Sequence, residues 1–276
     1  MEQYYFLFGI GLLWSIFAVV QDLKTREVSN WLNFSLIGFA LAYRAFYSLF
    51  SSDYLFLISG LLGFGVFFGL AHLFYYTKVF AGGDAKLLMG FGVILPYGNF
   101  NELLFLGVTF CFALFFFGAL YGLIYSVFIV LKNMKRFKRE FFRRIKIVKW
   151  VFFVLLLFSI ILMFLDYSII IFGIFVILLL FLYAYVKALD SCMIKLVNFK
   201  NLQEGDWLEK DVKIGKKMIK KSVHGLSKDE IKLLKKFRKS VYIKEGIPFT
   251  PAFLLSLIAM VFFSLTSGFD FLLSLF

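Results

Sequence analysis

Cysteine, proline and acidic residues are all scarce in this sequence. Its 276 residues include two cysteines, Cys111 and Cys192, and three prolines. Two cysteines provide neither a disulfide framework nor a CxxC zinc motif, and three prolines exclude a proline-rich linker. We therefore expect no metal site and no cofactor.

Hydrophobic residues dominate the composition. They make up 62% of the chain, with 41 phenylalanines, and the mean hydropathy of +0.88 is far above that of soluble proteins. The apolar residues fall in long uncharged runs, which is typical of membrane helices. Basic residues follow the first run, whereas in a cleaved signal peptide they precede the apolar region. The sequence predicts an all-α polytopic membrane protein.

We expect about eight membrane helices with the N-terminus outside. The apolar segments are residues 4–21, 31–50, 54–77, 85–97, 103–131, 150–165, 167–187 and 247–268. With the N-terminus outside, the inner loops and their flanks hold 29 of the 30 Lys and Arg residues, and only Arg44 lies toward the outer side. This distribution follows the positive-inside rule.

The fourth segment is short for a membrane span. Thirteen helical residues rise only about 20 Å, against a hydrocarbon core of about 30 Å. Asp84, which precedes this segment, is therefore expected to be drawn inward from the cytoplasmic surface. Non-helical backbone is expected around Gly82 and Gly83, which is tolerated at membrane depth only inside the protein or beside water.

The remaining charge pattern divides the chain further. We assign residues 1–131 to a membrane core that carries Asp22 and Asp84, 132–187 to a basic cytoplasmic loop plus an extra membrane hairpin, 188–246 to a small cytoplasmic module, and 247–276 to a C-terminal membrane helix. Residues 132–149 hold nine basic residues and one acid, which favours a surface on anionic lipid; nucleic acid is not an expected partner.

The polar module has recognisable local patterns. Ser227 and Glu230 fit a capping box that opens an amphipathic helix through Ile231, Leu234 and Phe237. Short strands are expected at 207–208 and 212–214. The module is either a lid or docking surface for a substrate, or simply a folded loop.

Two aspartates stand at the inner ends of apolar segments. Asp22 ends the first, and Asp84 follows two glycines before the fourth. An acidic residue at membrane depth is expensive and indicates function by default. Two carboxylates that share a water and one proton can hydrolyse a peptide bond, because one takes the proton of the attacking water and the other protonates the leaving amine. The sequence does not say which is which.

Other interpretations of these residues remain open. Asp22 alone would be read as an interfacial or capping residue, and Gly82-Gly83 as a tight turn or a helix-packing site. Lys24 and Lys86 are most simply positive-inside anchors, with a supporting role at the site as the alternative. The chain could also be an ion-coupled transporter that uses Asp84 beside a broken helix, a presenilin-like protease, or a non-catalytic assembly scaffold.

Three short motifs resemble the type IV prepilin peptidase family, and in particular its archaeal preflagellin peptidase branch of GxGD-type intramembrane aspartyl proteases. The first catalytic aspartate of that family is followed by a short basic turn, as at Asp22. The second lies in a Gly-x-Gly-Asp motif followed by Lys, as at Asp84, although Ala81 replaces the first glycine here. The last helix opens with Ile-Pro-Phe-x-Pro, here Ile247-Pro248-Phe249-Thr250-Pro251.

The resemblance implies a function. Such enzymes remove the basic leader of type IV pilin-like or archaellin precursors, just before an apolar helix and at the cytoplasmic face of the cell membrane. It implies Asp22 and Asp84 as catalytic residues, with Gly82 and Gly83 shaping the site. Bacterial members that also methylate the new N-terminus carry a four-cysteine element, which is absent here, so we expect cleavage without methylation and an archaeal source.

Overall fold

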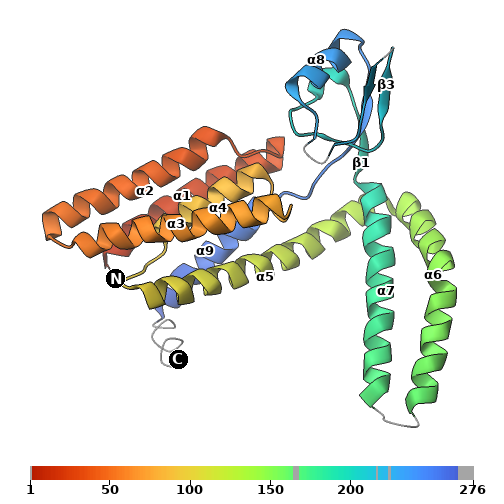
Figure 1. Cartoon of the computed structure of the whole chain (residues 1–276), viewed down its shortest axis with the longest axis horizontal. Helices are drawn as coiled ribbons and strands as arrows, with labels where there is room; N and C mark the ends of the chain where they lie inside the picture. Colours follow the sequence, from red (N-terminus) through yellow and green to blue (C-terminus); the bar gives the residue numbers. More distant parts are fainter. Residues whose placement is uncertain (1, 164–167, 216, 223–224, 267–276) are drawn as a thin grey trace. The chain divides into compact units, whose positions relative to one another are not determined.

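The computed structural model describes residues 2–163, 168–215, 217–222 and 225–266 (Figure 1). Most of these residues are helical, as predicted. The chain forms two compact units: Met1–Leu123 with Ile247–Phe276, and Ile124–Gly246. The boundary at 123/124 falls inside helix α5, so each unit is described by itself.

The first unit is a helical bundle. It contains α1 (Glu2–Thr25), α2 (Asn30–Ser51), α3 (Tyr54–Tyr76), α4 (Gly82–Ile94), the first part of α5 (Phe100–Lys132) and α9 (Thr250–Leu265). In this bundle α4 packs against α1, α2 and α3, and α9 packs against α1 although more than 200 residues separate them in the chain. The short α4 therefore lies in the core of the unit, and its apolar face is almost entirely buried.

Helices α3 and α4 cross in backbone contact at two glycines. A β-carbon on Gly63 would overlap the carbonyl oxygen of Gly92, and one on Gly92 would lie 2.6 Å from the carbonyl oxygen of Gly63. Small residues at a membrane-helix crossing permit this approach. The Tyr97 hydroxyl donates to the Gly92 carbonyl over 3.0 Å, and the Tyr4 hydroxyl donates to the Tyr97 carbonyl over 2.8 Å. The crossing is thus closed by backbone packing and by two buried hydroxyls.

The guanidinium of Arg44, in the second half of apolar α2, is fully buried. It donates to the carbonyl oxygens of Val93 at 2.7 Å, Leu95 at 2.9 Å and Phe56 at 2.7 Å. The first two belong to the C-terminal end of α4, where carbonyls have no partner within the helix. Arg44 therefore caps α4 at the end opposite Asp84.

The second unit contains a helical hairpin. Helix α6 (Met134–Met163) and helix α7 (Ser168–Cys192) pack along each other (Figure 1). Residues 134–149 of the basic stretch form the first half of α6, which is continuous with its apolar half. The tip of this hairpin, expected near Asp166, lies outside the described residues.

A small α/β module follows α7. Three strands, β1 (Ile194–Val197), β5 (Val241–Lys244) and β2 (Trp207–Leu208), form an antiparallel sheet in the order β1-β5-β2, and β3 (Val212–Ile214) pairs with β4 (Lys217–Ile219). The predicted strands at 207–208 and 212–214 are confirmed. Helix α8 (Lys228–Lys236) begins with the predicted capping box. Ile231 and Leu234 are buried, but Phe237 caps the helix and is 55% exposed, so its place on the buried face was wrong.

The helix lengths bear on the predicted spans. Five described helices are long and apolar enough to cross a membrane: Gln3–Thr25, Asn30–Ser51, Tyr54–Tyr76, Phe100–Lys132 and Gly173–Cys192. Thr250–Leu265 is apolar but shorter. Helix α4 has 13 residues, the length predicted for this segment, but it begins and ends three residues earlier than the predicted 85–97. The prediction of an all-α polytopic membrane protein is confirmed.

Candidate active site

Asp22 lies in the last turn of α1 and is only 6% exposed. Its Oδ2 accepts two hydrogen bonds from Thr250, one from the backbone N–H over 3.2 Å and one from the hydroxyl over 2.9 Å. Thr250 is the first residue of α9 and is itself fully buried. The Ile-Pro-Phe-x-Pro step that opens the last helix thus provides two hydrogen-bond donors to Asp22.

Asp84 lies in the first turn of α4, and its side chain is partly exposed. The carboxylate accepts a hydrogen bond from the backbone N–H of Ala81 and lies close enough to Asp22 for the two charges to repel. The structure therefore brings the two aspartates, 62 positions apart in the sequence, to one region of the bundle.

The glycines before Asp84 are helical, which corrects the expectation of non-helical backbone there. Helix α4 begins at Gly82, and the irregular backbone ends at Ala81. A β-carbon on Gly83 would sit 3.4 Å from the backbone nitrogen of Val28, whereas one on Gly82 would have only the Tyr75 ring, at 3.8 Å, within reach. The close approach of backbone thus occurs at Gly83, because the loop after Asp22 runs past it.

Polar side chains fix this loop and the start of α4. The Gln21 side-chain oxygen accepts from the backbone N–H and the hydroxyl of Ser29, over 3.0 and 2.9 Å. The Asn33 amide, fully buried on α2, donates to the carbonyl oxygen of Gly83 over 3.3 Å. Hydrogen bonds therefore hold both the loop that follows Asp22 and the start of the helix that carries Asp84.

The two lysines considered as supporting residues differ. The ammonium group of Lys86 donates to the Asn30 side chain over 2.6 Å, which links α4 to the start of α2. Lys24 is exposed at the end of α1. Lys86 thus acts on the position of α4, and the structure gives Lys24 no such contact among the described residues.

An aromatic cluster lies where α9 enters the bundle. The ring of Phe80 is 5.2 Å from that of Phe249 and 5.9 Å from that of Phe253, measured between centroids. Phe91 stacks on Phe253 at 5.5 Å, so the cluster joins α9 to α4. The Phe249 ring also fills the space left by Gly118 of α5. This packing sets the position of Thr250.

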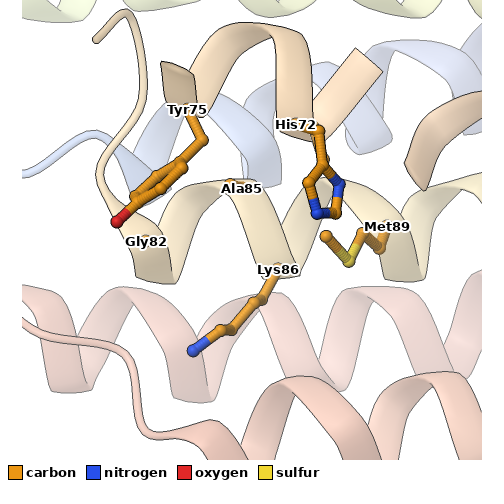
Figure 2. Close-up of a pocket in the computed structure, with 7 residues that line it drawn as sticks. His72, Tyr75, Gly82, Ala85, Lys86 and Met89 are labelled. Atoms are coloured by element: carbon orange, nitrogen blue, oxygen red, sulfur yellow. The ribbon is translucent and has the colours of Figure 1, made fainter. Parts of the chain in front are cut away.

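A groove of about 280 Å³ opens between α3 and α4 (Figure 2). His72 and Tyr75 of α3 face Gly82, Ala85, Lys86 and Met89 of α4 across it. Asp84 is two residues beyond Gly82, about 200° around a helix, and is not among the lining residues. The groove therefore lies on the face of α4 opposite the aspartate pair. His72 bonds within its own helix, to the Phe68 carbonyl over 2.9 Å.

The fold and the paired carboxylates define a polytopic helical membrane protein with an acidic site formed by α1 and α4. Residues 9–127 of this chain match the type IV leader peptidase family, so the resemblance predicted from the motifs is confirmed over this range. The match includes Asp22 and Asp84 but not the start of α9.

Two relatives of this chain are named as preflagellin peptidases. The chain is similar to preflagellin peptidases from Methanocaldococcus jannaschii, with 36% identity over 92 residues, and from Methanococcus voltae, with 33% over 91 residues. The aligned stretches cover 33% and 32% of this chain, and only 39% and 38% of those relatives. No solved structure matches the chain significantly.

Thr250 and Asn33 are the polar residues that the sequence interpretation missed. Both are buried on apolar helices, and their partners lie 228 and 50 positions away. The Ile-Pro-Phe-x-Pro step contained Thr250 as its variable position, so the signal was present but pointed to the prolines.

Proposed function

We propose that this protein is an intramembrane aspartyl endopeptidase that removes the basic leader of archaellin or type IV pilin-like precursors. The observation that carries the proposal is the approach of Asp22 and Asp84 on α1 and α4 within the range that matches the leader peptidase family. The preflagellin peptidases among its relatives supply the substrate class.

The proposed reaction needs only the two carboxylates and one water. One carboxylate removes a proton from the water as its oxygen bonds to the scissile carbonyl carbon, and the other donates a proton to the nitrogen as the carbon–nitrogen bond breaks. Gly83 allows the Asp22 loop to pass close to Asp84, and Lys86 holds α4 against α2. These contacts fix the distance between the two acids.

We propose that the site faces the cytoplasm, with residues 1–131 and 247–276 as the membrane core. The positive-inside rule supports an inner position for the loops at 22–30 and 78–84, which contain the two aspartates. In this scheme residues 132–187 contribute the basic half-helix and the hairpin, and residues 188–246 form a cytoplasmic module.

The direct test is cleavage of a purified precursor by the full chain in detergent. We expect one cut between the basic leader and the apolar helix of an archaellin-type or pilin-type precursor, read by mass spectrometry. With S-adenosylmethionine present, the new N-terminus is expected to stay unmethylated. Failure to cut either precursor class would contradict the proposal, and a methylated product would contradict its second part.

We also propose that the basic half of α6 binds anionic lipid. Lys135, Lys138 and Lys146 are exposed there, and each lysine near an anionic surface contributes about 1 kcal/mol. Changing all three to Gln is expected to reduce the rise in melting temperature when phosphatidylglycerol replaces phosphatidylcholine in nanodiscs. The same change at exposed Lys228, Lys232 and Lys235 of α8 is the matched control and should retain that rise. An equal response in both variants would argue against the lipid surface.

A further inference from the structure

We propose that Thr250 is a positioning residue that favours Asp22 as the base of the pair and leaves Asp84 as the acid. The inference rests on the peptidase function proposed above and adds to it the roles of the two carboxylates. Its starting point is the unequal hydrogen bonding of the two aspartates.

Asp22 is bound as an anion would be. Two donors of Thr250 converge on the single oxygen Oδ2, over 2.9 and 3.2 Å. An oxygen that accepts two hydrogen bonds is poorly placed to carry a proton, and hydrogen bonds to the charged form of an acid favour that form. The donor N–H is also at the first turn of α9, where the partial positive charge of the helix is concentrated. Oδ1 has no protein donor within the described ranges and is left to receive a proton from water.

Asp84 has a weaker set of donors. Its carboxylate accepts one backbone hydrogen bond, from Ala81, and stands beside the negative charge of Asp22. Because the two carboxylate charges repel each other, the proton stays on the carboxylate with fewer donors. That one is Asp84.

Charged groups on the helices that pack against α1 do not reverse this order. Helices α9, α2 and α4 pack against α1. Described α9 carries no Asp, Glu, Lys, Arg, His, Cys or Tyr. The charged and titratable residues of α2 and α4 are Tyr43, Arg44, Tyr47, Asp84 and Lys86. Arg44 is occupied by carbonyls at the far end of α4, and Lys86 by Asn30. The charge that acts on Asp22 from these helices is therefore that of Asp84.

The assignment fixes the direction of proton movement. Oδ1 of Asp22 takes a proton from water as the water oxygen bonds to the scissile carbonyl carbon. The carboxyl of Asp84 gives its proton to the amide nitrogen as the carbon–nitrogen bond breaks. Afterwards Asp22 is protonated and Asp84 ionised, and one proton passed from Asp22 to Asp84 restores the starting state.

The kinetic test compares Thr250→Val, Thr250→Ser and Ser256→Ala. Valine keeps the shape and the backbone N–H but removes the hydroxyl donor, so Asp22 is more readily protonated. We expect the acid limb of the kcat/KM profile to move up by about one pH unit and the alkaline limb to stay unchanged. At pH values below the acid limb, kcat/KM should fall about tenfold. Thr250→Ser should restore the wild-type limb. Ser256, a buried hydroxyl of α9 that bonds only to Ala252 among the described residues, is the control.

Two kinetic results would overturn the assignment: a uniform loss of activity in Thr250→Val with both limbs in place, or a shift of the alkaline limb alone. Either would make Thr250 a structural residue or reverse the roles of the acids.

An infrared measurement separates this inference from the function itself, because it needs no cleavage. The carbonyl stretch of a protonated carboxyl is expected at neutral pH in the wild type and should disappear in Asp84→Asn. A band that survives Asp84→Asn, or is missing from the wild type, would refute the assignment. Loss of cleavage by the wild type with the expected band present would refute only the peptidase function.

Discussion

Replacing either Asp22 or Asp84 by Asn is expected to reduce precursor cleavage by about 1000-fold or more. Asparagine has the same shape as aspartate but can neither accept the proton of the attacking water nor donate one to the leaving amine, and each such role is worth about 100- to 10,000-fold. Because the two acids act on one water, the double variant should be no worse than the poorer single one. Initial rates with a purified precursor measure the effect.

A matched control separates loss of chemistry from loss of a charge. Asp229 on α8 is highly exposed and bonds only to Lys232 among the residues described, so Asp229→Asn makes the same substitution outside the membrane bundle. It should cleave at the wild-type rate. Melting temperatures of all variants should remain close together. Wild-type activity in Asp22→Asn or Asp84→Asn would eliminate the aspartate pair as the catalytic centre.

Replacing Gly63 by Ala is expected to destabilise the membrane bundle by about 3 kcal/mol, at the upper end of the usual cost of overpacking. The new β-carbon would overlap the Gly92 carbonyl oxygen and lie 2.5 Å from the Tyr97 ring. A backbone carbonyl cannot rotate away as a side chain can, so α3 and α4 must separate. Thermal unfolding in detergent measures the loss.

Gly65 provides the comparison for this variant. It lies on the same helix two residues further on, and a β-carbon there would meet nothing within 4 Å. Gly65→Ala should therefore be neutral or slightly stabilising, since alanine is the better helix former. Because separation of α3 and α4 also moves Asp84, Gly63→Ala should lose activity as well. Equal melting temperatures for the two variants would show that the crossing is not as tight as described.

Local patterns predicted the helices, because a long apolar run that must cross a bilayer has few alternatives to a helix. The capping box at Ser227 and the strands near Trp207 were likewise local, and both are present. Strands β1 and β5 were missed because their pairing joins residues 194–197 to 241–244, across the whole module.

The candidate site was predicted only in part for the same reason. The chemistry of Asp22 and Asp84 is visible in the sequence because a carboxylate at the end of an apolar run is costly there. The donors around them are not, since Thr250 reaches Asp22 across 228 positions. The helical start at Gly82 also differed from expectation: two glycines suggested irregular backbone, but the packing of α4 in the core outweighs their low helix propensity.

The buried guanidinium of Arg44 has a consequence for how the protein is made. An arginine in the middle of a membrane helix disfavours insertion by about 2.5 to 3.5 kcal/mol when it has no partner. The carbonyl oxygens that satisfy Arg44 belong to Phe56, Val93 and Leu95, which leave the ribosome 12, 49 and 51 residues later. The hydrogen-bond partners of the Arg44 guanidinium are therefore complete only after α3 and α4 have been synthesised.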